Sequence, residues 1–239
     1  MKEHAALQID KLNIRYGQLE VVRSINLNLK KEEVVCLLGP NGCGKSSLLQ
    51  AIIGLTPYQG FIFTSTAKID FVSQNPSIML LPWLTNKQNI VFPSSIKEID
   101  ERLLEELLEF TKLKEFRNNY PYELSGGMAQ LVLLTRALLH HSSLILLDEP
   151  FKSLDFSIAK NLYKKVRDLF EKYTPTVLFV SHNIDEALFL ADRIIVLSEK
   201  PTQIKKEILV PFGNERELGI LNSVHFSELR KEVLNECLH

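Results

Sequence analysis

The first thirty residues alternate between apolar and polar positions with the period of a β-strand. The apolar residues of each run lie two positions apart: Leu7 and Ile9, Leu12 and Ile14, and Ile25, Leu27 and Leu29. The pair Tyr16-Gly17 interrupts the pattern and is typical of a turn. Residues 7–29 are therefore predicted to form a small antiparallel sheet.

Later apolar runs are continuous, which is typical of parallel strands covered on both faces. These runs are residues 34–38, 144–147, 176–180 and 194–197. Helical stretches are expected between them, at 46–53, about 128–139 and 156–172, and short strands at 61–73. This alternation predicts an α/β fold with a mostly parallel sheet.

The pattern changes near residue 76 and becomes mostly helical. Leu103, Leu104, Leu107 and Leu108 recur at helical spacing, and Asp100 is a suitable N-cap. We expect one domain over residues 1–239. Its core spans 1–75 and 140–205, a helical subdomain spans about 76–139, and a short C-terminal extension with an amphipathic helix at 226–236 spans 206–239.

Composition limits the environment and the partners. The formal net charge of -1 gives no overall attraction to nucleic acid or to an anionic bilayer. The chain has neither a signal-peptide-like apolar run at its N-terminus nor 18 consecutive apolar residues, so no membrane span is expected. Three cysteines, Cys36, Cys43 and Cys237, fit a reducing compartment better than a disulfide framework. We expect a cytosolic protein that does not bind nucleic acid.

One segment matches the phosphate-binding pattern G-x-x-x-x-G-K-[ST] in full. It is Gly39-Pro40-Asn41-Gly42-Cys43-Gly44-Lys45-Ser46, between a predicted buried strand and a predicted helix. The glycines allow backbone N–H groups to face phosphate oxygens, the lysine can reach the β- and γ-phosphates, and the serine can ligate Mg²⁺. A glycine-rich turn with an incidental lysine is disfavoured because pattern and context agree. The segment predicts triphosphate binding in a P-loop NTPase core.

Two carboxylates, Asp148 and Glu149, end the apolar run 144–147. Ligands of open α/β sheets bind at the carboxyl ends of strands, where the predicted phosphate loop also lies. Asp148 is thus a candidate Mg²⁺ ligand, and Glu149 a candidate for polarising the attacking water. The simpler alternative is that both residues begin a solvated loop.

The segment Leu124-Ser125-Gly126-Gly127-Met128 is a second potential anion-binding turn, at the head of a predicted helix. Alone it could be an ordinary glycine-containing helix cap. Its position after a helical insertion and about twenty residues before Asp148 resembles the ABC ATPase family. The resemblance covers residues from about 7 to 205.

The resemblance assigns roles to further residues. It implies that Tyr16 stacks on adenine, that Ser47 and Asp155 join the ATP-binding set with Ser125, Gly126 and Gly127, and that His182 contacts the γ-phosphate. Gln74 resembles the glutamine that senses Mg²⁺ and water. The implied catalytic residues are Lys45, Gln74, Glu149 and His182, and the implied metal ligands Ser46, Gln74 and Asp148. Singly, each has a structural explanation; for example, His182 could end a strand beside a capping box of Asn183 and Glu186.

The family implies a mechanism and partners. Two copies would associate head to tail, with ATP between the phosphate loop of one and the Ser125 turn of the other. Transmembrane permease subunits, and indirectly a solute-binding protein, would complete a transporter, with this chain peripheral on the cytoplasmic face of the plasma membrane. Hydrolysis of ATP with Mg²⁺ would drive it.

Finer features resemble the nitrate, sulfonate and taurine importer branch, which includes importers of thiamine-precursor pyrimidines. They include Phe151 and Leu81-Pro82-Trp83-Leu84. Departures are Leu131 in place of a basic residue, Lys152-Ser153 in place of Gly-Ala, and Lys200-Pro201-Thr202 in place of Arg-Pro-Gly. An exporter subunit, an ABC ATPase outside transport and a regulatory nucleotide-binding module remain alternatives at this point.

Overall fold

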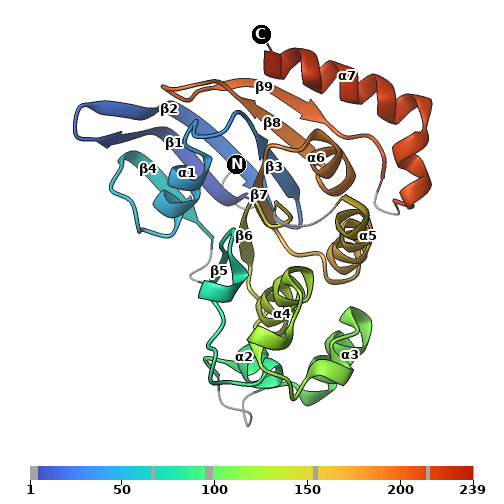
Figure 1. The fold of residues 1–239 in the computed structure, drawn as a ribbon. Helices are drawn as coiled ribbons and strands as arrows, with labels where there is room; N and C mark the ends of the chain where they lie inside the picture. Colours follow the sequence, from blue (N-terminus) through green and yellow to red (C-terminus); the bar gives the residue numbers. More distant parts are fainter. Residues whose placement is uncertain (1–4, 66–67, 95–98, 153–155, 214–215, 239) are drawn as a thin grey trace.

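The computed structural model describes residues 5–65, 68–94, 99–152, 156–213 and 216–238. Its strands form two sheets, and its helices cover the larger sheet and build a separate helical part (Figure 1). This architecture confirms the predicted α/β fold with an antiparallel N-terminal sheet and a helical insertion. Among the described residues, no helix has the length and apolarity needed to cross a bilayer.

The smaller sheet is antiparallel and has the order β2-β1-β4. Its strands are β1 (Ala5–Tyr16), β2 (Leu19–Lys30) and β4 (Gln59–Thr64). Gly17 makes the turn between β1 and β2 with a φ of 60°, which a glycine adopts without steric cost. The apolar residues of β1 and β2 that the alternating pattern identified are all buried, and Val21 and Val22 of β2 are buried as well.

The larger sheet has six strands in the order β5-β6-β7-β3-β8-β9. They are β5 (Ile69–Val72), β6 (Leu144–Asp148), β7 (Val177–Ser181), β3 (Val34–Leu38), β8 (Arg193–Leu197) and β9 (Ile204–Leu209). All neighbours are parallel except β9, which is antiparallel to β8. The sheet therefore continues across residue 205 into the segment expected as an extension.

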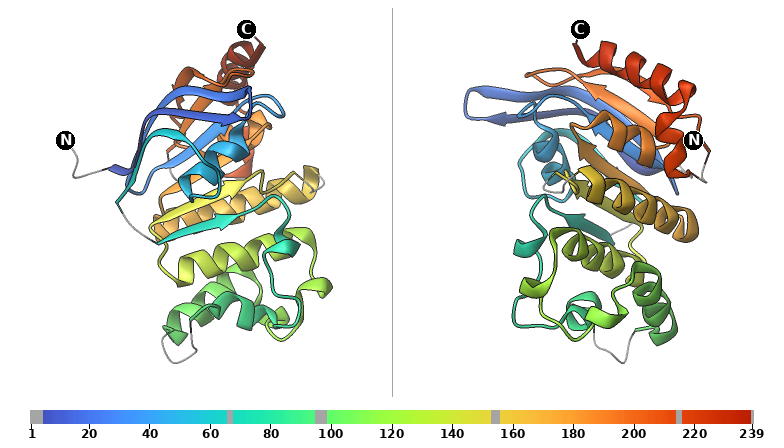
Figure 2. Two further views of the ribbon diagram at one scale, coloured as in Figure 1. Left: turned by 90° about the vertical axis from the view of Figure 1, so that its left-hand side faces the viewer. Right: turned by 45° about the vertical axis from the view of Figure 1, so that its right-hand side comes forward.

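Several helices pack around this sheet. They are α1 (Lys45–Ile52), α4 (Gly126–Leu139), α5 (Phe156–Tyr173), α6 (Ile184–Leu190) and α7 (Val224–Leu238). Figure 2 shows α7 beside β8 and β9 at the opposite end from the helical part. Gly54, with a φ of 76°, follows the end of α1 and stops that helix.

Strand β3 divides the apolar interior into two clusters. Val34, Cys36 and Leu38 pack into the cluster that contains α4, α5 and α6, whereas Val35 and Leu37 pack into the one shared with α1 and the antiparallel sheet. Because alternate side chains of a strand face opposite sides, a continuous apolar run is needed here. This double burial fixes the carboxyl end of β3, where the phosphate loop begins.

The helical part spans η1 (Pro76–Ile78), α2 (Asn86–Val91), α3 (Glu101–Thr111), η3 (Lys114–Phe116), η4 (Pro121–Glu123) and α4. Asp100 caps α3 by accepting hydrogen bonds from the N–H groups of Arg102 and Leu103, as its sequence position predicts. Leu104, Leu107 and Leu108 are buried. This part joins the core through α4, which contacts both β5 and α5.

Two buried arginines anchor the segment before η5 (Leu218–Asn222) to the end of α6. Arg216 donates to the carbonyl oxygens of Leu188, Phe189 and Ala191 at 2.8–3.0 Å. Arg167 donates to Leu190 O and to Asp192. The guanidinium groups thus satisfy carbonyls that a helix leaves unpaired at its end, although burial lowers the pKa of Arg216 to about 9.

Candidate active site

The loop between β3 and α1 is closed around a lysine. Lys45 is only 4% exposed, and its Nζ donates to the carbonyl oxygens of Gly39 at 2.8 Å and Pro40 at 2.9 Å. Gly44 has a φ of 121°, and a Cβ there would lie 2.7 Å from the Cγ1 of Val21. The loop therefore needs glycine at this position, and it holds a buried cation beside the N-terminus of α1.

A threonine from the hairpin between β8 and β9 supports the same loop. Thr202 is 1% exposed, and its Oγ1 donates to the carbonyl oxygen of Cys43. Its backbone is tied to β2, because its N–H donates to Val21 O and its carbonyl accepts from Arg23 N. The loop conformation therefore depends on a residue far along the chain.

Ser46 and Asp148 bring two hard oxygen atoms together. Ser46 Oγ donates to Asp148 Oδ1 at 2.9 Å, across the carboxyl ends of β3 and β6. Burial raises the pKa of Asp148, which is 8% exposed, so the carboxylate lacks full compensation for its charge. Within the described ranges no cluster of three His, Cys, Asp or Glu residues forms a complete cage. A serine and one carboxylate fit Mg²⁺, which usually retains water and phosphate ligands.

Glu149 lies next to Asp148 and faces three cationic or potentially cationic groups. Its Oε2 is 2.6 Å from Lys152 Nζ and 3.5 Å from His182 Nδ1, and its Oε1 is 4.0 Å from Lys45 Nζ. Its backbone has a φ of 44°, an uncommon conformation for a residue with a side chain. The chain thus places a nearly buried carboxylate, 9% exposed, beside the phosphate loop.

Tyr16 is at the entrance to the loop. It lines a cavity of about 200 Å³ together with Gly42, Gly44, Lys45, Ser46, Ser47 and Glu149 from the predicted set, and with Leu19, Val21 and Lys200. Tyr16 is 46% exposed, and its hydroxyl donates to Ser47 Oγ at 3.3 Å. This bond, followed by one with Thr56, lowers the pKa of the phenol. An exposed ring held by its hydroxyl can offer one face to a planar ligand.

Gln74 lies in a separate, open cleft of about 1050 Å³. Asp148 and Gly126 also line this cleft, as do exposed apolar residues such as Leu55 and Ile78. The structure therefore places Gln74 in the same cleft as Asp148, the candidate metal ligand, and not in the cavity around Lys45.

The Ser125 turn stands apart from the phosphate loop, at the head of α4 in the helical part (Figure 1). Ser125 caps α4 by accepting a hydrogen bond from Met128 N at 3.3 Å. Ser125 and Gly126 are exposed, and Gly127 is buried. None of the three lines the cavity around Lys45. Asp155, the remaining predicted site residue, lies outside the described residues together with Ser153.

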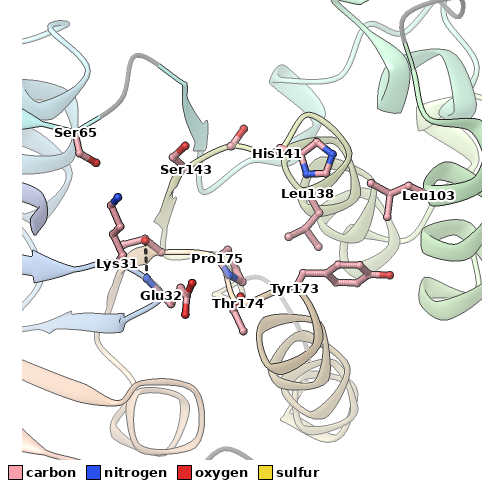
Figure 3. A pocket seen from close by; sticks show the side chains of 12 residues that line it. Lys31, Glu32, Ser65, Leu103, Leu138, His141, Ser143, Tyr173, Thr174 and Pro175 are labelled. Atoms are coloured by element: carbon pink, nitrogen blue, oxygen red, sulfur yellow. Dashed lines mark hydrogen bonds between the residues drawn. The ribbon is translucent and has the colours of Figure 1, made fainter. Parts of the chain in front are cut away.

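Another cavity, of about 450 Å³, lies at the amino ends of the parallel strands of the larger sheet, opposite the ends that carry the phosphate loop. Figure 3 shows its lining, which includes Lys31, Glu32, His141, Thr174 and Pro175 from the segments that precede β3, β6 and β7. Glu32 N donates to Thr176 Oγ1 at 2.9 Å and ties two of these segments together. None of the predicted site residues within the described ranges lines this cavity.

Thr202 and Lys152 had no functional role predicted from the sequence. Both stand at positions that depart from the resembled family, and this departure was the available signal. Their contacts with Cys43 and Glu149 depend on loop geometry that no local pattern specifies. The suggested capping box after His182 is absent: Asn183 caps α6 alone, and Glu186 is buried, 4% exposed.

Comparison with known proteins decides the family. A model of the ABC transporter family matches residues 22–152. The chain belongs to the ABC transporter family. It is 37% identical to the aliphatic sulfonates import ATP-binding protein SsuB of Bacillus cereus over 92% of this chain and 89% of that protein. It is 40% identical to an SsuB of Pseudomonas syringae pv. tomato over 82% of this chain and 84% of that protein.

Solved structures agree with this membership. The fold matches cbiO1 of Clostridium perfringens, part of an ABC transporter complex, with a TM-score of 0.77, 22% identity, and coverage of 97% of this chain and 96% of that one. The dimeric cassette MJ0796, bound to ADP and Pi after hydrolysis, matches at 27% identity with a TM-score of 0.71 over 87% of this chain and all of its own. As an ABC cassette, the present chain is an ATP-binding ATPase.

Proposed function

We propose that this subunit hydrolyses ATP in a site completed by a second copy of itself, and that hydrolysis powers import of a sulfonate-like anion through separate membrane subunits. The observation that carries the proposal is the separation of two anion-binding helix N-termini within one chain. The head of α1 belongs to a closed loop with a buried lysine, whereas the head of α4 is exposed and lies outside the cavity around that lysine.

The residues of the closed loop have distinct tasks in the proposed reaction. Backbone N–H groups of the loop and the Lys45 ammonium bind the β- and γ-phosphates. Glu149 orients a water and accepts its proton as the oxygen attacks phosphorus and the bond to ADP breaks. His182, which already lies 3.5 Å from Glu149, contacts the transferred phosphoryl group.

Ser46 and Asp148 are the proposed magnesium ligands. Their oxygens already share a hydrogen bond, and Gln74 lines a cleft that reaches Asp148. When bound, the cation would neutralise charge on the phosphates. Its positive charge would also offset the cost of burying Asp148, whose pKa is raised in its absence.

The second copy supplies what the closed loop lacks. The Ser125 turn presents exposed backbone and a hydroxyl at the positive end of α4, which suits a phosphate oxygen from another subunit. The dimeric state of MJ0796 supports this arrangement, and we assign Asp155 to the same contact. ATP bound by both copies would stabilise the dimer, and its hydrolysis would release them.

The open cleft around Gln74 is the proposed docking site for the membrane subunits. Leu55 is 71% exposed and Ile78 is 72% exposed on its rim, so an apolar surface is available beside a catalytic residue. A protein bound there could respond to the presence of nucleotide through Gln74. The subunit would then be peripheral, at the cytoplasmic face of the membrane.

The transported solute is assigned from the sulfonate-import relatives. Uptake of a labelled aliphatic sulfonate should disappear in cells whose only copy carries Glu149→Gln, while the variant protein is still produced. Uptake of nitrate, taurine and a thiamine-precursor pyrimidine should be measured in parallel. Because taurine is itself an aliphatic sulfonate, only loss of nitrate or pyrimidine uptake in place of sulfonate uptake would contradict the assigned solute, and neither result would contradict the ATPase site.

A further inference from the structure

Lys152 forms the shortest of the three charged contacts with Glu149. Its Nζ lies 2.6 Å from Oε2, and its backbone N–H donates to Glu149 O at 3.3 Å, so the two residues close a turn directly after β6. The Lys152 side chain is 37% exposed and the Glu149 side chain 10% exposed. A flexible lysine therefore reaches inward from the surface to a nearly buried carboxylate.

The other two partners of Glu149 indicate which ligand this group of charges can bind. Lys45 and His182 come from the phosphate loop and from the end of β7, and both are proposed to contact the γ-phosphate. In the subunit without nucleotide, the carboxylate is the anion that these groups share. A terminal phosphate carries more negative charge and more acceptor oxygens than a carboxylate, so it competes effectively for all three.

We propose that Lys152 is a further ATP-contacting residue, which pairs with Glu149 in the empty site and transfers to the terminal phosphate when ATP binds. The transfer adds a cation at the phosphate and at the same time frees Glu149 to accept a proton. A lysine suits this exchange because its ammonium has three donors on a flexible stem and no fixed planar geometry. The inference rests on the proposed ATP site and extends it.

The transfer predicts a difference between nucleotides. ADP lacks the terminal phosphate, so it offers Lys152 no comparable partner. Removal of the lysine should then weaken ATP binding about tenfold and leave ADP binding within about twofold. A lysine that served only to neutralise Glu149 would give a different result, because its effect would depend on the carboxylate.

The decisive measurement uses the Glu149→Gln subunit, in which the carboxylate is neutral and hydrolysis is blocked. Affinities for ATP and ADP, each with magnesium, should be measured by calorimetry before and after addition of Lys152→Met, with sedimentation at the same concentration to separate binding from dimerisation. Lys152→Arg should retain ATP affinity within about threefold. Lys114→Met, which removes a 52% exposed lysine of the helical part, is the matched control and should change neither affinity.

Each result bears on the inference. A selective loss of ATP affinity that arginine restores supports the transfer. Unchanged ATP affinity in the double variant would show that Lys152 only neutralises Glu149, and equal weakening of ATP and ADP would show that Lys152 does not act on the terminal phosphate. Either result would overturn the transfer. If the Glu149→Gln subunit itself bound neither nucleotide, the proposed site would fail, and this inference with it.

Discussion

The phosphate loop and the Ser125 turn are both proposed anion-binding helix N-termini, but their surroundings within the subunit differ. Around the loop, Lys45 is 4% exposed, Glu149 is 9% exposed and Thr202 is 1% exposed, and each has a partner inside the subunit. At the turn, Ser125 and Gly126 are exposed, and the cap on Met128 N satisfies only α4 itself. The first is prepared by folding, whereas the second is exposed, as the proposed contact with a partner copy requires.

The largest expected effect comes from neutralising Glu149, the proposed base, beside the phosphate loop. Glu149→Gln should lower ATPase turnover about 10³-fold, because an amide cannot accept the proton of the attacking water. ATP binding should persist, since Lys45 and the loop are unchanged, and ATP should drive dimer formation. Steady-state phosphate release and sedimentation with ATP would measure both. Turnover close to that of the parent would exclude Glu149 as the base.

A buried acid near the phosphate loop should make the stability of the folded subunit depend on pH. Glu186 is buried in the helix that follows His182, and its Oε1 has no hydrogen-bond partner within the described structure. Burial raises the pKa of Glu186 to about 8, and the nearby charge of Glu149 adds to the shift. Because the folded state resists ionisation, its stability is complete below the ordinary glutamate pKa and is lost as pH rises to about 8.

Glu186→Gln should remove this pH dependence. The free energy of unfolding of the variant, relative to that of the parent, should rise by about 4 kcal/mol between pH 4.5 and 8. Urea unfolding at several pH values would measure the difference, with Glu207→Gln at an exposed strand as the control. A constant difference across this range would mean that Glu186 ionises normally in the folded subunit.

At the Ser125 turn, the effect of a substitution on ATPase turnover should depend on the second copy. Ser125→Glu places a carboxylate where the proposed partner brings phosphate, so repulsion should lower turnover about 100-fold. Binding of ATP to the separate subunit should stay within about threefold of the parent, because the turn does not line the cavity around Lys45. Comparable loss of single-subunit binding would contradict the separation of the two half-sites.

A mixed dimer sharpens the same test. One copy with Ser125→Glu and one with Lys45→Ala should retain one intact composite site, since the two substitutions damage the same pocket when the copies are head to tail. Two copies with Ser125→Glu retain none. Equal activity of the two assemblies would argue against ATP binding between subunits.

The strands and the loop that form the phosphate-binding half of the site could be predicted from the sequence, because local patterns specify them. The alternating run gave β1 and β2, the continuous apolar runs gave the parallel strands, and the pattern from Gly39 to Ser46 located the loop. Contacts between distant segments were not accessible in this way. The bond from Thr202 to Cys43 joins residues 159 positions apart, and the ion pair of Lys152 depends on a turn with an unusual backbone at Glu149. Glu186 is another example, because its spacing from Asn183 suggested a capping box, whereas packing in the folded subunit buries its side chain.

Tyr16 gives the smallest expected effect and separates two parts of one side chain. Its ring is proposed to stack on adenine, whereas its hydroxyl bonds to Ser47 and Thr56 within the subunit. Tyr16→Ala should weaken ATP binding about tenfold, a value within the range for base–aromatic stacking. Tyr16→Phe keeps the ring and should change affinity by less than about threefold, and GTP should lose affinity in parallel with ATP because stacking tolerates any base. Titration of both variants with both nucleotides would decide the point: equal weakening by Ala and Phe would mean that the hydroxyl, by holding Ser47 beside the phosphate loop, contributes the binding energy instead of the ring.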